Sequence, residues 1–206
     1  EWIGIRPGTD GLFVMSLIRE LLLAGKIDEE YLVRYTNVHW LVTQNEGEEN
    51  HGLYIRDADG VAQCWDGEKL ALAAVSDVNA KPTLIGEIEL PDGRKAVPSF
   101  ELLARHFLDN QYAPEAVAAA TGVAAGTIRR IAAELADIAF NETIELPIEW
   151  VDVFGRKHDK VVGRPISMHA MRGISAHSNG FHTCRAIHIL QLLLLVLLEV
   201  HQRLNQ

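Results

Sequence analysis

The stretch "IRPGTDGLF", residues 5–13, separates a short extended lead from a long segment of periodic apolar residues. Pro7 and Gly8 break the extended backbone, because proline and glycine together favour a tight turn. Thr9 or Asp10 is well placed to cap a following helix, whose first N–H groups need acceptors. This stretch therefore predicts a turn from an extended segment into a helix, with polar side chains gathered at the start of that helix.

Helices and short extended pieces alternate along the rest of the chain. Apolar residues at helical spacing predict a helix over 12–22. Within 44–98, turn signals separate short strand-like pieces, and we interpret this region as a hairpin-rich insertion. This alternation favours the α/β class, as a layered domain with a mostly parallel sheet flanked by helices. Further helices are expected at 27–35, 99–107, 112–121, 126–139 and 184–204, and extended segments at 144–153 and 161–171.

Composition excludes several kinds of protein. The 206 residues have a formal net charge of −9, which disfavours non-specific binding to nucleic acid or to an anionic membrane. The hydrophobic fraction of 48% is that of a globular chain, so disorder is excluded. Cys64 and Cys184 are the two cysteines and neither lies in a CxxC pair, so no iron–sulfur or zinc-ribbon site is expected within the chain.

The sequence pattern of residues 116–136 is typical of a helix-turn-helix, with Arg129 and Arg130 in the second helix. A DNA-binding regulator is therefore one alternative, although acidic residues flank these two arginines. A run of histidines in the C-terminal third raises a second alternative, a metal site, but their spacing lacks the close ligand pairs that zinc sites use. We therefore predict no metal-ligating residues within the chain.

Charge is distributed unevenly near the C-terminus. Residues 160–198 contain no Asp or Glu but retain Lys160, Arg164, Arg172 and Arg185. Such a segment is suited to a phosphate, a pyrophosphate or a small oxyanion. Within it, "MRGISAHSNG" (171–180) reads as a donor-rich loop bounded by glycines that leads into a helix, which is typical of an anion site, although it does not match GxGxxG.

Three separated stretches together resemble one family, the molybdopterin oxidoreductases of the dimethyl sulfoxide reductase type. "WIGIRPGTDGLFVMSLIRELL" (2–22), followed by "IDEEYLVRYT", is similar to the family's "RPGTDxAL" segment. "YAPEAVAAATGVAAGTIRRIAAELA" (112–136) is similar to "TPExxAxxTGVPAxTIRRLAxE". "RGISAHSNGFHTCRAIHILQLLL" (172–194) is similar to "GxxxHxNGxxxxRAxxxLxxLxG". The three stretches occur in the family's order and span nearly the whole chain.

The resemblance implies a bis(molybdopterin guanine dinucleotide) cofactor that carries molybdenum. It assigns Gly8, Thr9 and Asp10 to a guanosine end of that cofactor. A carboxylate such as that of Asp10 can accept paired hydrogen bonds from guanine, and Gly8 lets the backbone approach the nucleotide. Near the pterin and the metal, the resemblance places Arg172, Gly173, Ala176 and His177, and it makes Arg172 the candidate catalytic residue because an arginine suits an anionic substrate.

The resemblance also implies that residues 1–206 form part of a larger cofactor-binding region. A [4Fe–4S] cluster is expected only in a missing N-terminal region, and the isolated chain is expected to be inactive. The sequence of residues 147–180 is most similar to the branch of the family that acts on a sulfur oxyanion or on polysulfide. This branch includes the catalytic subunits of sulfite dehydrogenases. The tail "VLLEVHQRLNQ" (196–206) departs from the glycine-rich continuation of the family.

Partners and location follow from the same resemblance. It implies an iron–sulfur electron-transfer subunit, together with a membrane anchor subunit, at the cytoplasmic face of a bacterial membrane in preference to the periplasmic face. No nucleic-acid partner is expected. Because a cut sheet would leave unpaired edges, we expect the isolated chain to self-associate. A structural or assembly module that has kept the fold and lost the cofactor remains a further alternative.

Overall fold

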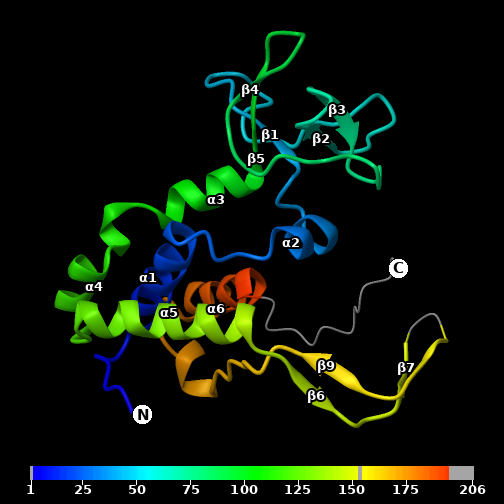
Figure 1. The fold of residues 1–206 in the computed structure, drawn as a ribbon. Helices are drawn as coiled ribbons and strands as arrows, with labels where there is room; N and C mark the ends of the chain where they lie inside the picture. The colour runs from blue at the N-terminus through cyan, green and yellow to red at the C-terminus, as the bar shows by residue number, and fades with distance from the viewer. Residues whose placement is uncertain (1, 153–154, 195–206) are drawn as a thin grey trace. The chain divides into compact units, whose positions relative to one another are not determined.

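The computed structural model describes residues 2–152 and 155–194 (Figure 1). The chain forms two compact units, which are described one at a time. Unit 1 consists of Glu1–Asp28 with Phe107–Gln206, and unit 2 consists of Glu29–His106. The tail 196–206 and the last part of the helix predicted at 184–204 lie outside the described residues.

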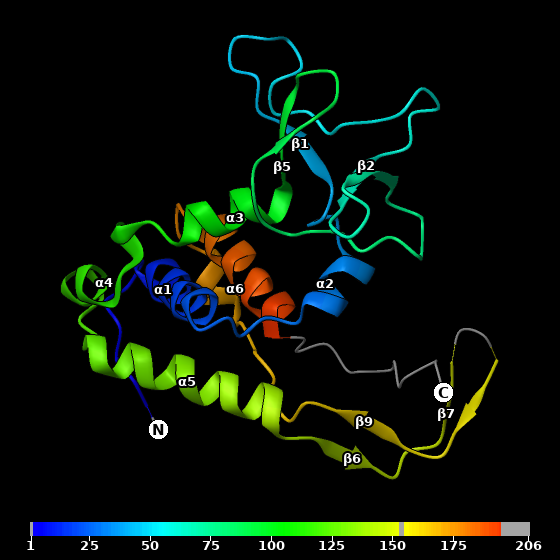
Figure 2. The same cartoon turned by 45° about the horizontal axis from the view of Figure 1, so that its top comes forward.

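Unit 1 is built around three helices that pack together: α1 (Asp10–Leu23), α5 (Ala125–Asn141) and α6 (Gly180–Leu194) (Figures 1 and 2). Each helix contributes apolar residues at helical spacing to a shared core, where Ile18, Ile128 and Leu194 are fully buried. Shorter helices complete the unit: η1 (Asn110–Tyr112), α4 (Pro114–Thr121) and η2 (Arg172–Ser175). None of the helices among residues 2–152 and 155–194 is both long and apolar enough to cross a membrane.

The turn between α4 and α5 lies against the segment that precedes α1. Gly122 takes a left-handed backbone with φ of 79° at the end of α4, a conformation that glycine adopts without steric cost. The Thr121 hydroxyl donates to the Val117 carbonyl at 2.9 Å and accepts from the Val123 N–H at 3.1 Å. Arg6 donates from Nη1 to the Ala119 carbonyl at 2.8 Å, which satisfies one of the open carbonyls at the end of the helix. This turn therefore fastens the segment before α1 to α4.

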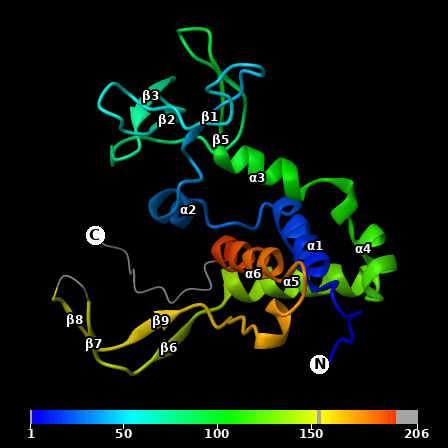
Figure 3. The same ribbon diagram turned by 180° about the vertical axis from the view of Figure 1, so that it is seen from behind.

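An extended arm follows α5 (Figure 3). β6 (Ile144–Leu146) pairs with β9 (Val161–Gly163), and β7 (Trp150–Val151) pairs with β8 (Lys157–His158), both antiparallel. The two ladders are successive parts of one hairpin. It returns the chain from α5 to the loop that precedes η2.

Unit 2 is a small β-rich module with its own core. β1 (Leu41–Thr43), β5 (Lys95–Pro98) and β4 (Ile88–Glu89) form one sheet, and β2 (Gln63–Asp66) pairs with β3 (Ala71–Ala74). The core consists of Leu41, Ile55, Ile88, Leu90 and Ala96, with Trp65 packed against it. Two helices flank these strands in the sequence, α2 (Glu29–Tyr35) and α3 (Ser99–Phe107).

Asp66 organises the turn after β2. Its buried carboxylate accepts hydrogen bonds from the N–H groups of Glu68, Lys69 and Lys81. These donors, first of all the Lys69 N–H, stabilise the charged form and lower the Asp66 pKa to about 2.

The prediction of a mostly parallel sheet is wrong. Every strand pair among residues 2–152 and 155–194 is antiparallel, and the sheets contain two or three short strands. A parallel pair requires a crossover connection, commonly a helix. Among the described residues, no helix lies between β1 and β5 in unit 2 or between β6 and β9 in unit 1. The helices of unit 1 therefore pack on one another and do not cover a central sheet.

Candidate functional site

The first part of the candidate site is the turn that begins α1. Thr9 donates to the Arg6 carbonyl from its N–H at 3.2 Å and from its hydroxyl at 2.7 Å, so the turn closes over Pro7 and Gly8. Gly8 has φ of 81°, which suits glycine after proline in a type II turn. Thr9 occupies the N-cap position, but its hydroxyl makes no capping bond to the helix. The cap expected from Thr9 or Asp10 is therefore not formed.

The absent cap leaves the start of α1 able to receive a ligand. Within the described residues, the N–H groups of Asp10, Gly11 and Leu12 bond to no acceptor, and the Phe13 N–H is the first to find one, the Thr9 carbonyl at 3.2 Å. The carboxylate of Asp10 is half-buried and also makes no hydrogen bond or ion pair with a described residue. The end of this helix thus offers N–H donors next to a carboxylate acceptor.

The second part of the site is the loop before α6. The Gly180 N–H donates to the His177 carbonyl at 2.9 Å, and the Ala176 N–H donates to the Gly173 carbonyl at 3.2 Å. A Cβ atom at Gly180 would lie 2.3 Å from the Ser175 carbonyl oxygen, so only glycine fits where η2 turns into α6. This close approach fixes the direction in which α6 leaves the loop.

The two parts meet although they are far apart in the sequence. Asn179 donates from Nδ2 to the Gly8 carbonyl at 3.2 Å. A Cβ atom at Gly8 would lie 4.0 Å from His177 Nδ1, and a Cβ atom at Gly11 would lie 2.8 Å from the Thr183 hydroxyl. α1 and α6 therefore begin side by side, and both helix N-termini carry partial positive charge at the same edge of unit 1.

Of the residues predicted for the site, Gly8 and His177 are adjacent, and Thr9 and Asp10 follow Gly8 directly. Arg172, Gly173 and Ala176 lie further back in the second loop and are exposed, as is His177. Their assignment to the pterin end of the cofactor stays a prediction. Gly173 has open space where a Cβ would stand, and within the described chain the Arg172 guanidinium has no hydrogen-bond or ion-pair partner.

Three contributors to the site were not predicted from the sequence. Arg6 holds the first turn against α4, Asn179 joins the two loops, and Gly11 allows α1 to approach Thr183. The glycine at 11 and the Asn-Gly pair at 179–180 were visible in the sequence. The distant residue that each of them contacts depends on how α1 and α6 pack, which the local sequence does not specify.

The cations of the positive segment 160–198 are of two kinds, those paired with a carboxylate and those without a partner among the described residues. Lys160 pairs with Glu145 at 2.8 Å, and Arg164 is a largely buried residue that pairs with Asp28. Both cations are therefore paired with carboxylates of this chain. Arg172 is exposed, as is Arg185 on α6, and neither has a partner among the described residues, so the charge open to a ligand lies close to the loop before α6.

Two other sites are less suited to a ligand. Arg129 pairs with Glu115 at 2.7 Å and Arg130 pairs with Glu134 at 2.9 Å, so the guanidinium charge that DNA would require is already met by carboxylates. Across residues 2–152 and 155–194, no three side chains of His, Cys, Asp or Glu gather closely enough to hold a metal ion.

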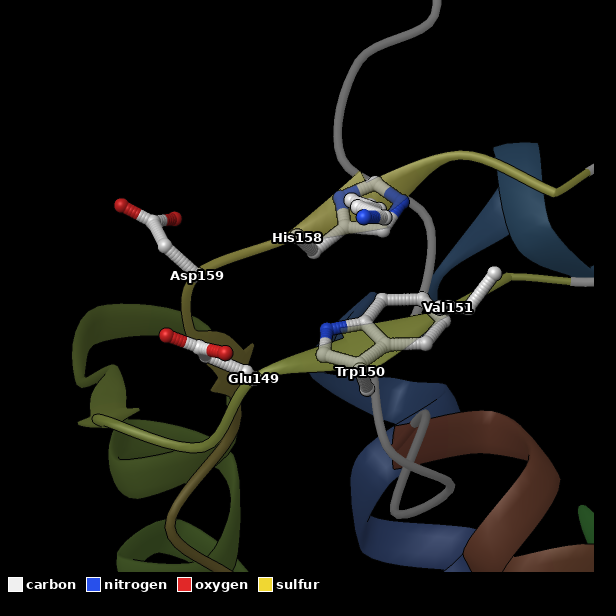
Figure 4. A pocket seen from close by; sticks show the side chains of 6 residues that line it. Glu149, Trp150, Val151, His158 and Asp159 are labelled. Carbon is white, nitrogen blue, oxygen red and sulfur yellow. The ribbon is translucent and has the colours of Figure 1, made fainter.

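A shallow hollow lies on the arm (Figure 4). The rings of Trp150 and His158 stack with centroids 4.3 Å apart, and Glu149 and Asp159 lie beside them. One hairpin supplies the whole lining, and none of the three family-like stretches contributes to it. The stacked rings stabilise the arm and provide no group aimed at a bound molecule.

Comparison with known proteins agrees with the resemblance. No family profile matches the chain. Over 203 aligned residues, the chain is 41% identical to one subunit of the sulfite dehydrogenase of Allochromatium vinosum. The alignment covers 94% of this chain and 21% of that protein, so the chain spans about a fifth of the curated relative. The expected relationship to sulfite dehydrogenases is confirmed: over nearly all of its length, this chain is a homologue of part of a sulfite dehydrogenase subunit.

Proposed function

We propose that this chain is the part of a longer molybdenum oxidoreductase that holds a molybdopterin guanine dinucleotide cofactor. The observation that carries the proposal is the hydrogen bond from Asn179 to Gly8, which brings two of the three family-like stretches together at one edge. The homology to part of a sulfite dehydrogenase supports the same proposal.

The start of α1 fits a guanosine end. Asp10 provides a carboxylate that has no partner within the described chain, and guanine presents two neighbouring N–H donors to such an acceptor. Gly8 and Thr9 directly precede it, and the open N–H groups of α1 suit a phosphate. We assign Gly8, Thr9 and Asp10 to the guanosine and its phosphate.

The loop before α6 fits the pterin end. His177 can donate or accept a hydrogen bond close to Gly8, while Gly173 and Ala176 leave room for a planar group. Arg172 supplies a positive charge that can bind an anionic substrate, and sulfite, the substrate named for the relative, is such an anion. In this role Arg172 binds and orients a sulfur oxyanion.

The remaining chemistry requires polypeptide beyond this chain. When bound, the molybdenum of the cofactor supplies the redox step, and this chain's residues bind and orient. A [4Fe–4S] cluster, a membrane anchor and an iron–sulfur subunit would carry the electrons away. We therefore expect the 206-residue chain alone to be inactive.

The test replaces Asp10 in the full-length polypeptide. Asp10→Ala should lower the content of molybdenum and of guanine nucleotide several-fold, because the guanine loses its acceptor, while the thermal midpoint changes little. Asp59→Ala removes the same charge at an exposed position of unit 2 and serves as the control. Unchanged cofactor content in Asp10→Ala would refute the assignment.

A further inference from the structure

The outer edge of β3 differs from the other open strand edges. β2 pairs with β3 on one side and bridges to Pro82 on the other, so β3 is the last strand of its sheet among the described residues. Residues 70–76, "LALAAVS", carry no charge. Strand edges that face water usually carry charged side chains, proline or a bulge that prevent pairing with another chain.

Three other open edges carry such protection. β4 contains Glu89, β6 contains Glu145 and β8 contains Lys157. β1 is covered, since the Thr43 N–H donates to the Leu53 carbonyl at 3.0 Å. β7 and β9 also lack a charged residue, but they contain two and three residues, so β3, with four, is the longest uncharged open edge among the described strands.

The backbone of β3 has groups directed outward. The Val75 N–H donates to the Ala62 carbonyl, and Ala73 lies opposite Cys64 in the antiparallel register. Because hydrogen-bonding direction alternates along a strand, Leu72 and Ala74 direct their N–H and C=O groups away from β2. The Ala74 carbonyl already accepts from the Asp77 N–H at 2.9 Å, so the Leu72 N–H, the Leu72 carbonyl and the Ala74 N–H are the groups open to one more strand.

Apolar side chains surround these groups. Leu72 is 38% exposed, Leu70 is 70% exposed and Val78 is 94% exposed. All three belong to unit 2, and they follow one another closely along the chain. A strand added at this edge would therefore gain both backbone hydrogen bonds and apolar contact.

We propose that β3 pairs antiparallel with β3 of a second copy of this chain, centred on Ala73. This register sets Leu72 opposite Ala74 of the second copy, so a large side chain meets a small one. On both sides of the axis, the Leu72 carbonyl faces the Ala74 N–H of the other copy. No like charges oppose each other. The same pairing at β6 would set Glu145 against its own copy, which is unfavourable.

A second copy fits this edge because the arrangement closes. A two-fold axis through Ala73 uses the same edge of both copies and leaves no edge for a third, which gives a dimer and not a fibre. The pairing is independent of the cofactor. The sequence predicted self-association from the edges of a cut parallel sheet, and no parallel sheet is present among the described residues. The proposed pairing places the self-association at β3 of unit 2.

The test measures the mass of the 206-residue chain in solution by light scattering over a range of concentrations. Wild type should be a dimer that dissociates on dilution. Leu72→Lys should raise the dimer dissociation constant by about ten-fold or more, because a charge enters the edge. Leu53→Lys, at a residue that is 59% exposed and in no strand, should leave the dimer intact.

A second variant separates loss of pairing from loss of fold. Ala74→Pro removes an outward N–H and no bond to β2, so it should give a monomer with the circular dichroism of wild type. A wild type that is monomeric at every concentration overturns the proposal, even if another protein binds the edge. A dimer that survives both Leu72→Lys and Ala74→Pro overturns it as well.

Discussion

Asn179 donates a hydrogen bond from Nδ2 to the carbonyl oxygen of Gly8 at 3.2 Å, across 171 positions of sequence. The bond ties the turn before α1 to the loop before α6. It brings residues 8–10 to the loop that contains His177, so that two separate stretches form one edge of unit 1.

Removing this side chain tests the link. Asn179→Ala should lower the free energy of unfolding by the net value of one hydrogen bond, about 0.5–1.5 kcal/mol. We expect the lower end of this range because the bond is exposed. Chemical denaturation provides the measurement. Ser178→Ala, at the neighbouring exposed residue, should be neutral. Equal stability of the two variants would show that the bond does not hold the loops together.

The turn into α6 depends on the absence of a side chain at Gly180. A Cβ atom there would lie 2.3 Å from the Ser175 carbonyl oxygen, so Gly180→Ala must displace backbone and should cost about 1–3 kcal/mol of stability. Gly126→Ala is the matched control, because open space surrounds Gly126 within α5 and alanine favours a helix. If Gly180→Ala melts at the wild-type temperature, the close packing of this turn is incorrect.

Arg164 is a structural cation. It donates to Asp28 and, at 2.7 Å, to the Leu194 carbonyl, and it lies over the Phe140 ring at 4.7 Å. Arg164→Ala removes the guanidinium that pairs with the largely buried Asp28 carboxylate and should cost about 3 kcal/mol in thermal or chemical unfolding.

The exposed pair of Lys160 with Glu145 is the control for Arg164. Lys160→Ala should change the midpoint little, because water and salt screen exposed pairs. A loss of stability in Lys160→Ala as large as that in Arg164→Ala would contradict the distinction between the two cations.

His39 makes unit 2 sensitive to acid. Its side chain is buried, and Nδ1 has no hydrogen-bond partner. Burial lowers the His39 pKa below 6.5, although the Val75 backbone partly offsets this. The unfolded chain therefore takes up a proton at a higher pH than the folded chain. Stability should decrease as pH falls below 6.5 towards the lower pKa of the folded state.

Thermal midpoints measured between about pH 7.5 and about pH 5 test this. His39→Leu should reduce the loss of stability on acidification, because the proton uptake of the unfolded state disappears. His51→Leu, at an exposed residue, should retain the wild-type slope. The same slope in His39→Leu and wild type would assign the acid response to other groups.

The helices were predictable from local sequence. Apolar periodicity placed α1, and α3 matches the predicted range 99–107. The sheet was not predictable in the same way. Val161–Gly163 and Ile144–Leu146 read as extended segments, but only the turn between them decides whether they pair directly or through a crossover. The helical segments around them gave the misleading impression of a parallel α/β unit.

The proximity of two predicted residues is seen in the structure, whereas the contacts that join the two loops were not predictable. Gly8 and His177 followed from the resemblance, and the structure sets them side by side. The bond made by Asn179 depends on how α1 and α6 pack, which no local pattern specifies. Arg164 was predicted to contribute charge to a ligand, whereas the structure pairs it with Asp28.

Metal and nucleotide analysis of the purified full-length polypeptide tests the central claim most directly. Acid hydrolysis should release guanosine monophosphate, and elemental analysis should find molybdenum in a constant ratio to it. That result would show that a molybdopterin guanine dinucleotide is present for residues 8–10 to hold. An active full-length enzyme that contains neither molybdenum nor a guanine nucleotide would contradict the account.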